Sequence, residues 1–189
     1  MPYIQNATSF IVETIFNLAL YIVLLRFWMQ WVRADFRNEF GQFIIKATNP
    51  VVIPLRRIIP SIGKVDTATV IFAVAIAILK VVALFLIFGS SVSSFSALKI
   101  LSFAIAVVLD SSIYVFLAAI VVGIIASWVN PNSYHPILSI AHSISNPLLA
   151  PARRLLPAMG GIDFSPMLVF LFLRVTQMLL IAPIYNLSI

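Results

Sequence analysis

The chain has 189 residues, of which 62% are hydrophobic and 10% are charged, and its net charge is +6 at pH 7. Soluble domains are about half apolar and about a quarter charged, so this composition excludes a soluble enzyme, a nucleic-acid-binding domain and a disordered chain. A membrane protein with several spans remains. Its complete lack of Cys excludes disulfides, thiol catalysis and Cys-ligated metals.

Four windows are long and apolar enough to span a bilayer, for which about 20 residues are needed. They cover residues 10–31, 67–89, 110–129 and 166–184. No basic residue precedes Arg26, so the amino terminus lacks the basic region of a signal peptide, and we expect no cleaved leader. The sequence therefore predicts an all-α integral membrane protein with about four transmembrane helices and short interfacial helices.

The stretch 93–109, which precedes the third span, permits two interpretations. It follows a polar turn, and residues 98–109 are apolar apart from Lys99 and Ser102. One interpretation is a connecting interfacial helix that leads into the third span. The other is a fifth span that turns at Asp110, Ser111 and Ser112. The shortness of the stretch and the tightness of that turn favour the interfacial helix.

An internal repeat relates the two halves of the chain at an offset of 97 residues. Ten of the 36 positions from 31 to 66 are identical to their counterparts, and no gap is needed. The matched residues of the first half are Trp31, Val32, Asn49, Pro50, Pro54, Arg56, Arg57, Pro60, Gly63 and Asp66. Apolar bias rarely matches such residue types, so we predict a first repeat at 1–92, a connection at 93–109 and a second repeat at 110–189.

Basic residues gather in the two loops, at 33–64 and 130–163. The first loop holds six Lys and Arg residues, and the second holds Arg153 and Arg154. Because basic loops stay in the cytoplasm, we expect both loops on the cytoplasmic side of the membrane and both termini outside. The two repeats are then parallel, related by an axis along the membrane normal.

Each loop carries the pattern Asn-Pro, Pro, Arg-Arg, Pro, Gly and Asp at matched spacing. Three Pro within eleven residues predict that no long helix crosses this segment, only one or two helical turns in the membrane interface. The Arg pairs are expected at headgroup level, where they anchor anionic lipid or dock a partner, while each Asp pairs with them or caps the next span. The candidate residues are Asn49, Arg56, Arg57, Asp66, Asn146, Arg153, Arg154 and Asp163.

At this motif the chain resembles the YggT family, also known as the YlmG family, and the likeness covers nearly the whole chain. It rests on segments 30–32, 40–43, 46–50 and 54–57 with Pro60 and Asp66, and on 127–128, 146–147, 151–154 and 156–166. The two-repeat form resembles the proteobacterial inner-membrane type. The resemblance implies a protein without established enzymatic activity. It also implies links to hyperosmotic tolerance in proteobacteria, to division or envelope organisation in Gram-positive bacteria, and to cytochrome b6 haem maturation or nucleoid distribution in plastids.

Charged residues within the spans form a second candidate site. The offset of 97 maps Glu13 onto Asp110, and at 1.5 Å per residue Glu13 and Lys80 lie about 27 Å and about 21 Å from the inner surface. Arg26 lies close enough to that surface to snorkel. We expect a polar cluster between the repeats that either orients helices by pairing or forms an ion or proton pathway. Its members are Glu13, Lys80, Asp110, Arg174 and Gln177, with Asn17 and Tyr114 able to contribute.

No catalytic constellation is recognisable. His135 and His142 are seven residues apart and can share a helix face, but no third ligand lies near them in the sequence, so we expect no metal and no cofactor. The leading hypothesis is a non-enzymatic membrane factor that organises or assembles partners through its Arg-Arg loops. The expected partners are anionic lipid, an unidentified membrane or cytoplasmic protein and further copies of the chain, with no direct nucleic-acid binding. The alternatives are an ion channel, transporter subunit or transport regulator and, more weakly, a haem-handling assembly factor.

Overall fold

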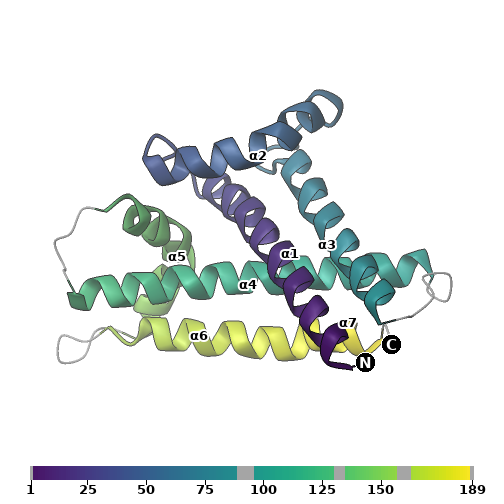
Figure 1. Cartoon of the computed structure of the whole chain (residues 1–189). Coiled ribbons are helices and arrows are strands. Elements are labelled where there is room, and N and C mark those ends of the chain that lie inside the picture. The colour runs from purple at the N-terminus through teal and green to yellow at the C-terminus, as the bar shows by residue number, and fades with distance from the viewer. Residues whose placement is uncertain (1, 89–95, 130–134, 157–162, 188–189) are drawn as a thin grey trace.

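The computed structural model describes residues 2–88, 96–129, 135–156 and 163–187, and this part of the chain is helical without a β-strand (Figure 1). The expected all-α fold is confirmed. The elements in chain order are α1 (Pro2–Trp31), α2 (Glu39–Ile58), α3 (Thr67–Ile87), α4 (Ala97–Val129), α5 (Pro136–Leu155) and α6 (Ser165–Thr176). A π-helical turn, η2 (Gln177–Ile181), and the short α7 (Ala182–Leu187) continue α6.

Four helical segments are long and apolar enough to cross a membrane, as the sequence predicts. They are α1, α3, α4 and the run from Ser165 to Tyr185 that combines α6, η2 and most of α7. The π-turn ends at Ile181, two residues before Pro183, which has no N–H to continue an α-helical ladder. In α3 and α4 apolar residues occupy nearly every position, which is typical of helices that face both lipid and protein.

Helices α2 and α5 are the two loop segments, and each is 20 residues long. The expectation that prolines limit these segments to one or two turns is wrong. Pro50 and Pro54 lie inside α2, as Pro147 and Pro151 lie inside α5. The two prolines of each helix are four residues apart and exposed, so the missing N–H groups lie on one outer face. The opposite face is buried, and its packing sustains the helix.

Helix α4 has 33 residues and runs through the stretch where the sequence leaves two interpretations open. Within the described residues 97–129 the structure has neither a separate interfacial helix nor a turn at Asp110, because residues 97–109 are the first part of α4. Ser112 stays helical by donating its hydroxyl hydrogen to the carbonyl of Val108, 2.9 Å away. At 1.5 Å per residue α4 is about 50 Å long, which exceeds the apolar core of a bilayer and requires a tilt.

Three buried clusters join these elements, and α4 contributes to all of them. The first lies between α1, α3 and α4 and centres on Leu20, Val81 and Val107. The second joins α4 to α5 and α6, whereas the third joins the end of α1 to α2, α4 and α5 around Met29 and Ile144. The central position of α4 therefore connects the two repeats.

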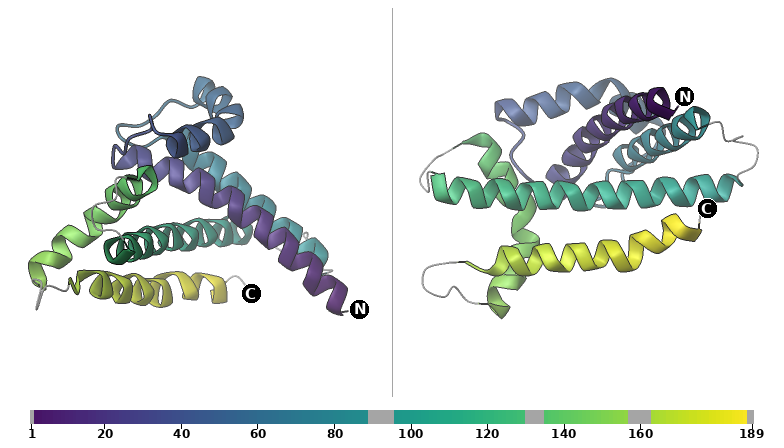
Figure 2. Two further views of the ribbon diagram at one scale, coloured as in Figure 1. Left: turned by 60° about the vertical axis from the view of Figure 1, so that its left-hand side comes forward. Right: turned by 60° about the horizontal axis from the view of Figure 1, so that its bottom comes forward.

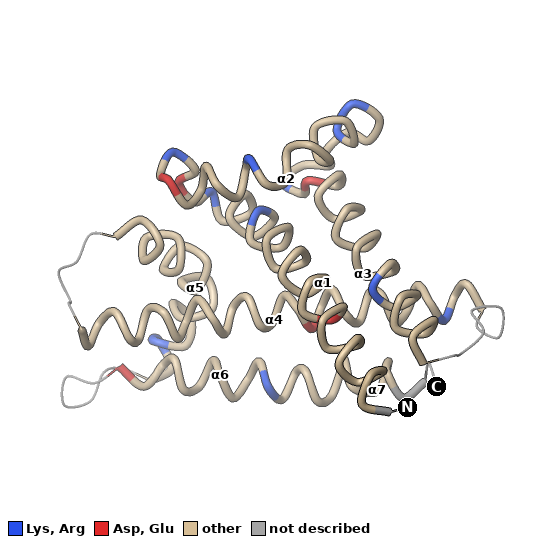
Figure 3. The backbone as a smooth tube through the Cα atoms, viewed as in Figure 1, with Lys and Arg blue, Asp and Glu red and all other residues tan. Residues whose placement is uncertain are grey.

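The two hairpins cross obliquely, with the α1–α3 pair inclined to the α4–α6 pair in both views of Figure 2. Helices α2 and α5 contact each other, and α5 also contacts α1. In Figure 1 α2 runs across the top and α5 lies at the left, whereas both termini lie at the lower right. Figure 3 shows Lys and Arg concentrated along α2 and at its junction with α3.

Candidate functional site

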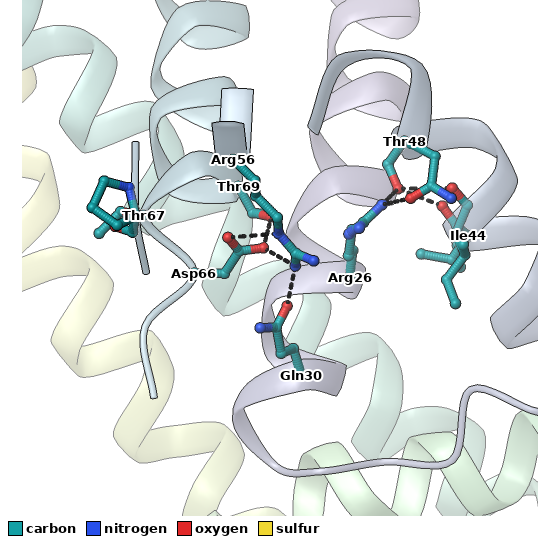
Figure 4. Close-up of polar contacts among 11 residues, drawn as sticks. Arg26, Gln30, Ile44, Thr48, Arg56, Asp66, Thr67 and Thr69 are labelled. Carbon is teal, nitrogen blue, oxygen red and sulfur yellow. Dashed lines mark hydrogen bonds and ion pairs between the residues drawn. The ribbon is translucent and has the colours of Figure 1, made fainter. Parts of the chain in front are cut away.

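The first corner is the junction of α2 with α3, formed by Gln30, Arg56, Asp66 and Thr69 (Figure 4). Arg56 Nη2 lies 2.5 Å from Asp66 Oδ2, and its Nε donates to Asp66 Oδ1 over 3.2 Å. Arg56 also donates to Gln30 Oε1 on α1, while the Thr69 hydroxyl donates to Asp66 Oδ2. Because the Asp66 side chain is fully buried, this network joins the ends of three helices around one enclosed carboxylate.

Arg26 lies beside the first corner and does not snorkel. It is only 5% exposed, and its Nη1 donates to Thr48 Oγ1 at 2.5 Å and to Asn49 Oδ1 at 2.9 Å. Thr48 in turn donates to the carbonyl of Ile44. A buried guanidinium is therefore held by neutral oxygens of α2, which fixes α2 against α1 (Figure 4).

The electrostatics of the first corner favour a charged Asp66. Burial alone raises the pKa of this carboxyl. The hydrogen bonds from Arg56 and Thr69 and the positive charges of Arg56 and Arg26 together outweigh burial and lower the pKa below its ordinary value. Asp66 is therefore an ionised structural partner of Arg56.

The second corner, formed by Arg153, Asp163 and Ser165, repeats the ion pair in a more open setting. Arg153 Nε donates to Asp163 Oδ2 at 2.9 Å, and Asp163 Oδ1 accepts from the backbone N–H of Ser165 at the start of α6. Burial again raises the pKa of Asp163, but the bonds from Ser165 and Arg153 lower it overall. The Arg153 and Asp163 side chains remain 50% and 36% exposed, so solvent screens this pair more than its counterpart.

The second arginine of each pair plays a different part. Arg57 and Arg154 are exposed, and within the described part of the chain neither makes a hydrogen bond or an ion pair. Each precedes an exposed aliphatic residue, Ile58 at 79% or Leu155 at 74%. Each corner thus holds one arginine internally and presents the next one to its surroundings.

The candidate residues outside the corners occupy mixed positions. Asn49 is half-buried and bonded to Arg26, whereas Asn146 is exposed on α5. His135 caps the start of α5, and His142 lies against Gly123 of α4. Pro157 and Gly160 of the second motif lie outside the described residues.

The intramembrane charges form two separate groups. Lys80 Nζ donates to Asn17 Oδ1 at 2.8 Å, and among the described residues it has no ion pair with Glu13. In the second repeat Arg174 donates to Gln177 Oε1 at 2.8 Å, and Gln177 donates to Asp110 Oδ1 at 2.5 Å. The structure therefore joins Asp110, Gln177 and Arg174 into one chain and leaves Glu13 outside it.

Sequence reasoning missed the polar partners of the first corner. Gln30 and Thr48 lie in segments that carry the family resemblance, but neither these segments nor the sequence around Thr69 indicates which residues they contact. The signal that could have found these residues is the offset of 97. It aligns Arg26 with Gly123 and Gln30 with Ser127, so it marks positions where the two repeats differ. Among the residues that the structure describes, no three His, Cys, Asp or Glu side chains are placed to hold a metal ion.

Comparison with known proteins supports the duplication. A sequence model of the CCB3/YggT family matches residues 5–87 and again residues 102–184. The two matches bracket α1–α3 and the spans α4–α6, so the family unit is a helical hairpin with its connecting helix. No solved structure matches the chain.

Several bacterial proteins are similar over nearly their full length. A Vibrio alginolyticus protein encoded in the proC 3′ region is 41% identical and covers 96% of this chain and 98% of its own. A Pseudomonas aeruginosa protein is also 41% identical, over 94% of this chain and 90% of its own, and YggT of Escherichia coli is 38% identical, over 92% and 89%. With both repeats matched, the chain belongs to the CCB3/YggT family.

Proposed function

We propose that this chain is a non-enzymatic factor of the bacterial inner membrane that assembles an acidic protein partner on its cytoplasmic side. The observation that carries the proposal is the duplicated exposed pair, Arg57 with Ile58 and Arg154 with Leu155. Arginine beside exposed apolar surface is the chemistry of energetically dominant contacts in protein interfaces.

The arrangement of the corners supports a separate docking surface on each repeat. Helices α2 and α5 contact each other, but their C-terminal ends, which carry the exposed arginines, meet α3 and α6 on opposite sides of the molecule (Figure 1). Arg56 and Arg153 are held by Asp66 and Asp163, which keeps both helix ends rigid. A rigid surface loses less conformational entropy on binding. The net charge of +6 favours a partner with an acidic surface.

The resemblance to the YggT family suggests the physiological condition under which the assembly acts. We propose that the assembly acts during hyperosmotic stress, when the envelope must be reorganised. The proposed role therefore follows from the surface and not from an inherited site.

Site-specific crosslinking in living cells tests the proposal. A photoreactive amino acid at Ile58 is expected to capture a discrete protein, and Arg57→Glu is expected to abolish the adduct by charge repulsion. Arg37→Glu is the matched control, because Arg37 is equally charged and exposed but lies before the other end of α2. Capture of lipid alone, or a protein adduct that withstands Arg57→Glu, contradicts the proposal.

A physiological experiment completes the test. In a deletion strain, the Arg57→Glu, Arg154→Glu double variant is expected to reach wild-type abundance and to fail in restoring growth at high osmolarity. Full restoration of growth by the double variant contradicts a role of the exposed arginines in this function.

Transport of ions is the second candidate, and the chain Asp110–Gln177–Arg174 favours it. Polar groups within membrane spans are costly and often mark ion or proton pathways. Proteoliposomes with K⁺ and H⁺ gradients separate the two candidates. Flux that Arg174→Met abolishes supports transport, whereas the absence of flux with retained crosslinking supports assembly.

A further inference from the structure

The two repeats differ where α1 and α4 face their connecting helices. At the offset of 97, Arg26, Phe27 and Gln30 of α1 correspond to Gly123, Ile124 and Ser127 of α4. Each residue of α4 is smaller than its counterpart. In the first repeat Arg26 and Gln30 fill the space between α1, α2 and α3 with hydrogen-bonded side chains.

A cavity occupies the equivalent place in the second repeat. It measures about 790 Å³ and lies between α4, α5 and α6, with Gly123 on its wall. This volume is within the range of small-molecule sites, roughly 300–1,000 Å³. We call it the second-repeat cavity.

The two ends of the second-repeat cavity differ in chemistry. Its polar residues come from α4, α5 and the start of α6 and are Ser127, His142, Ser145, Arg153 and Asp163. The Asp163 carboxylate is occupied by Arg153 Nε and by the N–H of Ser165, which leaves the two Nη groups of Arg153 available. Its apolar residues extend along the spans and include Val121, Ile124, Met167 and Phe170.

The apolar wall opens toward the surface that faces lipid. Met167 is 74% exposed, and Val121 and Phe170 are 41% and 40% exposed, all on membrane-spanning segments. Phe170 lies seven residues beyond Asp163, so the cavity runs about 10 Å down α6 from its charged end. A ligand must therefore combine a polar head at the helix ends with an apolar chain along the span.

We propose that the second-repeat cavity binds one anionic phospholipid. Charge decides the type of headgroup, because Arg153 and the adjacent Arg154 together exceed the single negative charge of Asp163. His142 also lines the cavity, while the hydroxyls of Ser127 and Ser145 donate to the backbone carbonyls of Ile124 and His142. Basic pockets between membrane helices recognise anionic headgroups in this way. At the equivalent place in the first repeat Arg26 and Gln30 fill the space between α1, α2 and α3. This inference shares Arg154 with the proposed partner surface, but it is tested separately through Gly123, which that surface does not include.

Native mass spectrometry of the detergent-purified full chain tests the proposal with dioleoyl-phosphatidylglycerol as the probe. One lipid is expected to bind at least about tenfold more tightly than dioleoyl-phosphatidylcholine, which has the same chains and no net charge. The water-soluble headgroup glycerophosphoglycerol is expected not to compete. Equal binding of both lipids overturns the headgroup assignment, and competition by the free headgroup assigns the site to soluble phosphate esters.

Gly123→Arg separates the cavity from general attraction to positive charge. A Cβ at Gly123 meets His142 at 3.4 Å, an ordinary contact, so the new side chain enters the cavity as Arg26 fills the first repeat. We expect binding of phosphatidylglycerol to weaken about tenfold although the protein gains a positive charge. Ala47→Arg adds the same charge on the exposed face of α2 and is expected to retain the site.

Unchanged or stronger binding by a folded Gly123→Arg variant overturns the proposal. If that variant fails to fold, Ser127→Trp provides the second test, because Ser127 is exposed at the cavity and bonds only within α4. It is expected to weaken binding by a similar factor, and retained affinity again contradicts the site.

Discussion

The two corners share one motif and differ in how deeply they are built into the protein. The Asp66 side chain has no exposed surface and joins three helices, whereas Asp163 is 36% exposed and bonds to Arg153 and the start of α6. Identical residues at identical spacing therefore have different energetic weight, because burial and neighbouring side chains determine the strength of an ion pair.

The neighbours explain the difference. Arg26, Gln30, Thr48 and Thr69 surround the first ion pair with hydrogen bonds, and the second repeat has smaller or nonpolar residues at the equivalent positions. We infer that the first corner mainly stabilises the fold and that the second has space for a ligand.

Asp66→Ala is expected to have the largest effect. It removes the buried partner of Arg56 and the acceptor of Thr69, so the free energy of unfolding should fall by about 3 kcal/mol. Asp163→Ala, at the matched position, should cost less than about 1 kcal/mol because solvent screens its pair. Unfolding by SDS in dodecyl maltoside micelles, followed by circular dichroism, measures both. Equal losses contradict the contrast between the corners.

Arg26→Met is expected to cause the second largest loss of unfolding free energy. It retains an apolar stem of similar length but leaves the oxygens of Thr48 and Asn49 without their charged donor, which should cost about 2 kcal/mol. The same unfolding measurement applies, with Arg57→Met as the control because Arg57 is exposed and without a partner among the described residues. A loss no greater than that of the control means that Arg26 does not hold α2.

The intramembrane groups provide a smaller contrast. Asp110→Ala leaves Gln177 without an acceptor in the chain to Arg174 and should destabilise by about 1 kcal/mol, the scale of hydrogen bonds between membrane helices. Glu13→Ala, at the pseudo-symmetric position, should change stability little, because the structure shows no hydrogen bond or ion pair of Glu13 among the described residues. A comparable loss for Glu13→Ala means that the cluster extends across both repeats.

Much of this contrast depends on features that a sequence pattern does not contain. The duplication and the four spans follow from the offset of 97 and from apolar length. Glu13 and Asn17 are one turn apart on one face of α1, and at 1.5 Å per residue Asn17 lies at the same depth as Lys80, about 21 Å, so depth favours Asn17 whereas opposite charge favours Glu13.

The connecting helices show a second limit. Proline content predicts a break, yet Pro50 and Pro54 remain in α2 because packing of its other face compensates for two lost hydrogen bonds. Asp110 and Ser112 suggest a turn, yet both stay helical because Gln177 and a backbone carbonyl supply partners. For α2 and for Asp110 a tertiary contact outweighs the local preference, whereas the bond of Ser112 lies within α4.

The loss of stability at acidic pH is expected to show the smallest difference between the two corners. Both Asp66 and Asp163 have pKa values below the ordinary value of about 3.9, so each stabilises the fold above that pH and loses this contribution as pH falls through its folded-state pKa. Stability should therefore be unaffected by these groups between pH 8 and about 5 and should decline below about pH 4. Asp66→Asn should flatten the decline more than Asp163→Asn, since the buried carboxylate has the stronger hydrogen-bond partners. SDS unfolding of the two variants between pH 6 and pH 3 measures this difference. A steeper acid dependence assigned to Asp163 reverses the order of the corners, because it requires the exposed pair to be the stronger one.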